Sequence, residues 1–272
     1  MLRPDDVDEP VGTIEQLLRR DRAIAITALA GVCLLAWAVI VQMARGMGGG
    51  TGMAGMTGAM AMPSPAPWRP ADLVALFTMW SVMMVAMMLP SAAPVALLVL
   101  NVLRRRHGSR LPFGATAAFL GGYVLVWAGY SAGATLTQGG LHSAALLSPD
   151  AMRVTPLLGG GLLIAAGVFQ WTPLKRACLS HCRSPLHFLG AEWREGTGGA
   201  LVMGLRHGAW CVGCCWLLMA LLFVAGVMNL AWVALLAGLV LIEKVAPAGL
   251  LVGRLAGVAL VGWGAWLVLA RA

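Results

Sequence analysis

The residues best suited to chemistry lie close together in the C-terminal half of the chain. They comprise one imidazole, one thioether and three thiols: Met203, His207, Cys211, Cys214 and Cys215. At about 100° per residue, an α-helix places all five side chains on about one third of its circumference. Thiolate, thioether and imidazole ligands suit Cu(I), and Zn(II) accepts thiolate and imidazole. This stretch therefore predicts a site for a soft metal, copper first and zinc second.

A second group of thiols and an imidazole precedes the first in the chain. Cys178, His181 and Cys182 fall within about 100° of one another on a helix. A stable disulfide is not expected on the cytoplasmic side of a membrane, so these thiols are available to a metal. An ordinary basic loop with incidental cysteines is nearly as good an interpretation of this segment alone. Because the two groups hold five of the six cysteines, we assign both to metal binding.

Methionine forms a third pattern. Met79, Met83 and Met87 recur at four-residue spacing and predict a stripe along one helix face, which by itself is more typical of core packing. Five further methionines stand among glycine, alanine and threonine, where no core needs filling: Met47, Met53, Met56, Met60 and Met62. Thioethers bind Cu(I) without losing a proton, so this segment is expected to capture metal. A low-complexity linker without a role is the alternative.

The overall composition indicates what kind of protein positions these groups. The chain has 272 residues, of which 60% are hydrophobic and 11% charged, whereas a soluble domain carries about 25% charged residues. This composition excludes a soluble globular fold, a disordered chain and a small disulfide-stapled domain. The net charge of +8 comes from arginines that punctuate apolar runs, which argues against a nucleic-acid partner. We therefore predict an all-α polytopic membrane protein.

About seven transmembrane helices fit the apolar runs, at about 20 residues per crossing. The expected spans are 23–42, 72–101, 113–137, 154–171 and three within 200–269, with breaks near Asn229 and 243–247. This division leaves a cytoplasmic acidic segment at 1–22, a first helix at 23–43, a Met/Gly-rich outer loop at 44–70 and a six-helix membrane domain at 71–272.

Basic residues at the span ends predict the orientation, since cytoplasmic loops carry an excess of Lys and Arg. Three basic groups agree in placing the N-terminus in the cytoplasm: 19–22, 104–110 and 175–194. Glu243 and Lys244 are expected to be compensating charges, paired with each other or with Arg206 or Lys175.

Several of these segments together resemble a known family. The matching strings are 79–91 (MWSVMMVAMMLPS), 173–185 (PLKRACLSHCRSP) and 204–219 (GLRHGAWCVGCCWLLM), with further likeness at 228–230 and 243–247. They resemble an uncharacterised bacterial family of predicted metal-binding integral membrane proteins, and the resemblance covers nearly the whole chain. It implies a multi-pass protein of the bacterial inner membrane that binds metal, and it supplies no reaction.

These observations lead to one predicted function and two alternatives. We expect a non-enzymatic membrane protein, with no catalytic residue, that relays copper across or into the bilayer for homeostasis or cuproprotein assembly. Its expected partners are the lipid bilayer, a metallochaperone or membrane cuproprotein, and further copies of itself. One alternative is a thiol–disulfide oxidoreductase that uses Cys211, Cys214 and Cys215. The other is a non-catalytic membrane assembly subunit.

Overall fold

The fold is all-helical in the part of the chain that the computed structural model describes, residues 9–48, 69–107, 112–147 and 153–270. The only β-type backbone pairing within those ranges is an isolated antiparallel bridge between Leu147 and Val154. The prediction of an all-α protein is confirmed. The elements are α1 Glu9–Gly48, α2 Pro70–His107, α3 Pro112–Ser143, α4 Pro156–Phe169, α5 Pro173–Arg183, α6 Pro185–Glu192, α7 Gly196–Ala220, α8 Leu222–Ala225, α9 Leu230–Val245 and α10 Gly249–Leu269.

The membrane-spanning helices number five or six among the described residues, whereas the sequence predicted about seven. Five helical segments are long and apolar enough to cross a bilayer, and the bent pair α4–α5 makes a sixth. Two predicted spans account for the difference. The segment 154–171 holds only the 14-residue α4, and the chain then bends by 65° into α5, which begins at Pro173. Helix α9 has 16 residues, fewer than the ~20 of a straight crossing.

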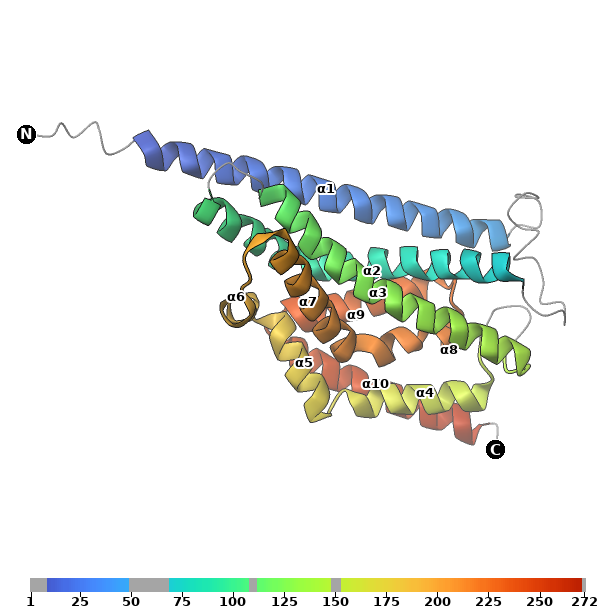
Figure 1. Cartoon of the computed structure of the whole chain (residues 1–272). Coiled ribbons are helices and arrows are strands. Elements are labelled where there is room, and N and C mark those ends of the chain that lie inside the picture. Colours follow the sequence, from blue (N-terminus) through green and yellow to red (C-terminus); the bar gives the residue numbers. More distant parts are fainter. Residues whose placement is uncertain (1–8, 49–68, 108–111, 148–152, 271–272) are drawn as a thin grey trace, which may run out of the picture.

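The helices form an elongated bundle (Figure 1). Helix α1 lies along one edge against α2, while α4 and α10 lie side by side at the opposite edge, with α7 and α9 between them. Helix α1 begins at Glu9, so the predicted boundary between an acidic segment and a first helix falls inside it. The outer loop predicted at 44–70 starts too early, since residues 44–48, Met47 among them, belong to α1, and the rest of its Met-rich part, 49–68, lies outside the described residues.

The crossing of α3 and α7 is unusually close and brings the two helices into backbone contact. A Cβ on Gly204 would overlap the carbonyl group of Phe119, so only glycine permits this approach. One consequence is that the next turns of α7, which carry His207 and Cys211, lie directly against Tyr123 of α3.

Local capping positions the two shorter helices that complete the site. Thr172 accepts a hydrogen bond from the Lys175 backbone N–H at 3.2 Å, which begins α5. Asn229 likewise accepts from the Trp232 N–H at 3.2 Å and begins α9, at the break that the sequence predicted. The second predicted break also holds, since α9 ends at Val245.

Ion pairs link the helices at the basic end of the bundle. This end carries Arg104, Arg105 and Arg106, at the end of α2. Asp21 of α1 is buried there and pairs with Arg104. Arg206 pairs with Glu192 of α6, so the predicted pairing of Arg206 with Glu243 is wrong.

Candidate metal centre

Five cysteines gather in one buried cluster between α5 and α7: Cys178, Cys182, Cys211, Cys214 and Cys215. All five are free thiols. Cys182 interacts with the side chains of both Cys211 and Cys214. Cys178 lies against the adjacent turn of α7, where a Cβ on Gly213 would come within 2.8 Å of its Sγ. The two cysteine groups that are separate in sequence therefore form a single group of thiols, which we call the five-cysteine cluster.

A buried cation touches this cluster. Lys244 of α9 donates a hydrogen bond to Cys211 Sγ at 2.8 Å and another to Ser91 Oγ at 3.0 Å. Tyr123 Oη lies 3.0 Å from the same sulfur atom. A buried charge is costly unless it is paired, and Cys211 supplies the opposite charge once its thiol loses the proton on binding a metal. The predicted pairing of Lys244 with Glu243 is therefore wrong.

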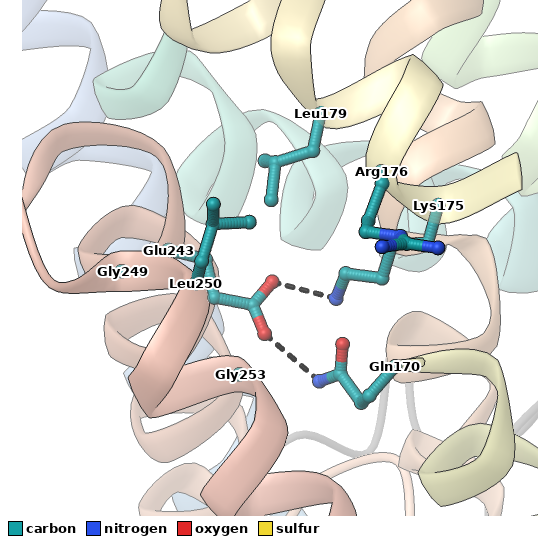
Figure 2. A pocket seen from close by; sticks show the side chains of 8 residues that line it. All are labelled: Gln170, Lys175, Arg176, Leu179, Glu243, Gly249, Leu250 and Gly253. Atoms are coloured by element: carbon teal, nitrogen blue, oxygen red, sulfur yellow. Dashed lines mark hydrogen bonds and ion pairs between the residues drawn. The ribbon is translucent and has the colours of Figure 1, made fainter. Parts of the chain in front are cut away.

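Glu243, the residue before Lys244 on α9, forms a separate buried network (Figure 2). Its carboxylate accepts hydrogen bonds from Lys175 Nζ at 2.7 Å and Gln170 Nε2 at 2.8 Å. The predicted pairing of Glu243 with Lys175 is confirmed. Arg183 donates to the carbonyl oxygens of Glu243 and Ala246, at 2.5 and 2.9 Å, and so caps α9. These contacts fix the end of α9 and thereby the position of Lys244.

The methionine stripe of α2 reaches the cluster through Met88. Cys215 Sγ lies 4.0 Å from Met88 Sδ, and the Met88 carbonyl accepts hydrogen bonds from Tyr123 and Ser91. The predicted ligands Met79, Met83 and Met87 are buried along the same helix. Trp80 lies on the stripe and donates to Gln138 at 2.7 Å. The spacing of the methionines does not predict that Met88 is the one that reaches the cysteines, because the face that α2 turns toward α7 depends on how the two helices pack.

His207 lies one turn before Cys211 in an aromatic enclosure. Its ring centroid is 5.1 Å from that of Phe188, 5.7 Å from that of Tyr123 and 5.9 Å from that of Phe119. The Nδ1 atom is buried and has no hydrogen-bond partner. Met203, one turn further back, is fully buried as well. An unsatisfied buried ring nitrogen is costly, and metal coordination is one way to satisfy it.

His181 does not join the cysteines. Its ring stacks on Trp210, with centroids 4.1 Å apart and planes at 10°, and it is half-buried. Cys178 and Cys182 are one turn apart and share the buried face of α5, whereas His181 is rotated from Cys182 by about 100°. The structure thus divides the predicted group of Cys178, His181 and Cys182.

The cysteine side chains are hydrogen-bonded as thiols. Cys214 and Cys215 both donate to the Cys211 carbonyl oxygen, at 3.1 and 3.0 Å. In these rotamers, no set of three or more His, Cys, Asp or Glu side chains within the described ranges has a metal-binding arrangement. Coordination by the cluster requires the two thiols to lose their protons and rotate away from that carbonyl.

The fold and the cluster define a multi-pass membrane protein with a buried thiol and methionine centre. A family model named PpoB2, described as a copper chaperone, matches residues 77–267, from α2 into α10. The chain belongs to this copper-chaperone family, which supports the predicted association with copper; nothing in the match supports zinc. No curated protein and no solved structure matches the chain.

Proposed function

We propose that this protein is a membrane-embedded carrier of Cu(I), with the ion held as cargo by the five-cysteine cluster. One observation carries the proposal: α5 and α7, which α6 separates in the chain, bring five free thiols together, with Met88 Sδ of α2 4.0 Å from Cys215 Sγ at their edge. Thiolates and thioethers are soft ligands that select Cu(I). Two thiolates of this cluster hold the ion, drawn from Cys178, Cys182, Cys211, Cys214 and Cys215, and the remaining cysteines stay protonated.

The charges at the five-cysteine cluster favour a monovalent ion as the cargo. Cu(I) held by two thiolates carries one net negative charge, which is costly to bury in a membrane interior. The Lys244 ammonium, 2.8 Å from Cys211 Sγ, supplies the single positive charge that neutralises such a centre. Zinc takes four ligands, and on four of these thiolates it carries two negative charges, one more than Lys244 neutralises.

The remaining predicted ligands suggest the path of the ion. The rise of α2 from Met79 to Met88 is about 13 Å, and it runs from the end that begins at Pro70 toward the cluster. Met79, Met83 and Met87 provide neutral thioethers along that path, and Met203 and His207 provide a thioether and an imidazole beyond it. We propose that copper enters through the methionines, stops at the cysteines and is handed to a metallochaperone or a membrane cuproprotein.

The test is copper binding by the protein purified in detergent under reducing conditions. A colorimetric Cu(I) chelator competes with the wild-type chain and with variants Cys211→Ser and Cys214→Ser. We expect both variants to lose the tightest Cu(I) equivalent. The matched control Cys33→Ser, on α1 and outside the cluster, is expected to retain it. Equal binding by all four proteins would overturn the proposal.

A further inference from the structure

A pair of histidines near the basic end forms a group that the cysteine cluster does not use. His181 on α5 and His187 on α6 have ring centroids 6.4 Å apart, with planes at 78°. Figure 1 shows α6 at the end of the bundle where α2 ends and α3 begins. We propose that His181 and His187 form a second Cu(I) site, through which the cargo leaves the five-cysteine cluster.

The hydrogen bonding of His181 leaves one nitrogen free for a metal. His181 Nδ1 lies 2.9 Å from the Ala177 carbonyl oxygen. A carbonyl oxygen only accepts hydrogen bonds, so Nδ1 carries the proton and Nε2 carries the lone pair. Histidines that bind metals use this arrangement, in which the second ring nitrogen donates to a carbonyl or carboxylate.

The ring of His181 is also held in one plane. It stacks on the indole of Trp210 at 4.1 Å and 10°. A surface histidine without such contacts samples several rotamers, and the loss of that freedom on binding a metal costs free energy. Stacking removes part of this cost in advance, which favours a ligand over a merely solvated side chain.

The spacing of the two rings fits a shared ion. A metal–imidazole bond of about 2 Å places the centroids of two imidazoles on one ion about 5 to 6.5 Å apart. The observed 6.4 Å lies at the upper end of this range, which corresponds to a nearly linear arrangement. Two-coordinate binding suits a d¹⁰ monovalent ion better than Zn(II), which prefers four ligands. His187 is exposed, so the site is open to an incoming acceptor.

The connection to the cluster runs through Cys182. This residue directly follows His181, is buried, and interacts with Cys211 and Cys214. Adjacent positions on α5 thus present a thiol to the interior and an imidazole toward the surface. Transfer between them is ligand exchange: copper remains Cu(I), the nitrogen lone pairs replace sulfur, and the released thiolates regain protons from water. The direction of this transfer rests on the proposed function, whereas the histidine site itself does not.

The experiment measures Cu(I) stoichiometry in the full chain, purified in detergent, for His181→Ala and His187→Gln. The matched control is His142→Ala, which removes an imidazole at the far end of α3. We expect each variant of the pair to retain one Cu(I) equivalent fewer than wild type, and His142→Ala to retain the same number. In ¹⁵N-histidine-labelled wild type, added Cu(I) is expected to shift the His181 Nε2 resonance.

The outcomes separate this inference from the proposed function. Unchanged stoichiometry in both variants, with no shift at His181 Nε2, would overturn the histidine site. If Cys214→Ser still loses its equivalent in that case, the cysteine cluster stands without it. Loss of one equivalent in the histidine variants supports the second site even if the cysteine variants bind copper like wild type.

Discussion

The charge of Lys244 is expected to determine how tightly the cluster holds copper, and Lys244→Met tests this. The lysine ammonium lies 2.8 Å from Cys211 Sγ, and a copper–sulfur bond adds about 2.3 Å, so the cation is about 5 Å from the centre of the singly negative copper–thiolate group. At an effective dielectric constant of about 20, removing one unit of attraction over this distance costs about 3 kcal/mol. The expected result is a Kd for Cu(I) raised by a factor of about 10².

The assay is competition with a Cu(I) chelator of known affinity, with the thermal unfolding midpoint measured on the same samples. Methionine is close to lysine in length, so most of the packing around α9 is retained. Lys244→Arg keeps the charge and serves as the matched control, with a Kd expected within about tenfold of wild type. A Kd for Lys244→Met equal to that of wild type would refute the charge argument, whatever the unfolding midpoint.

Three further substitutions test the supporting structure. Glu243→Gln leaves the buried Lys175 ammonium without its carboxylate and is expected to lower the free energy of unfolding by about 3–5 kcal/mol. Chemical denaturation measures this loss of stability. The double variant Lys175→Met with Glu243→Leu is expected to recover most of the lost stability. Gly204→Ala forces a methyl group onto the Phe119 backbone and is expected to destabilise the α3–α7 contact by about 1–3 kcal/mol; no change in the unfolding midpoint would contradict the close crossing. Met88→Leu conserves volume, so stability should change by less than about 1.5 kcal/mol. Loss of its thioether is expected to weaken Cu(I) binding about tenfold, an effect typical of a contact at the edge of a metal centre, and chelator competition measures it.

The sequence is sufficient to predict the helical class and the face of α7 that carries the site. Cys211, Cys214 and Cys215 share that face because helical periodicity alone places them there. Asn229 marks a helix start through its capping chemistry, which is local and readable from residue type. Both inferences depend on interactions within a few residues.

The rest of the site depends on tertiary packing, which periodicity does not determine. The merging of Cys182 with Cys211 and Cys214 requires α5 to bend away from α4 and lie against α7. Lys244 and Glu243 are neighbours in sequence, yet their side chains leave α9 about 100° apart and reach different partners, one a thiol and the other Lys175. The sequence leaves their partners open among each other, Arg206 and Lys175, because charge alone does not supply that geometry.

His181 is a residue that helical spacing assigns to the cysteine site but that the packing of α5 keeps out of it. Its spacing from Cys178 and Cys182 suggests a shared site, but the buried face of α5 comprises Lys175, Cys178, Leu179 and Cys182 and leaves His181 out. The imidazole remains at the surface and stacks on Trp210. The separation of polar from apolar faces therefore outweighs the sequence spacing at this position.

The central claim is tested most directly by the metal content of the wild-type protein, purified in detergent under reducing conditions from cells grown with copper and zinc. We predict bound copper in stoichiometric amount, no bound zinc, and loss of the copper in the variant with Cys182, Cys211 and Cys214 all changed to serine. Wild-type protein that is free of copper, with these cysteines paired in disulfides in the cell, would contradict the account and favour the thiol–disulfide oxidoreductase.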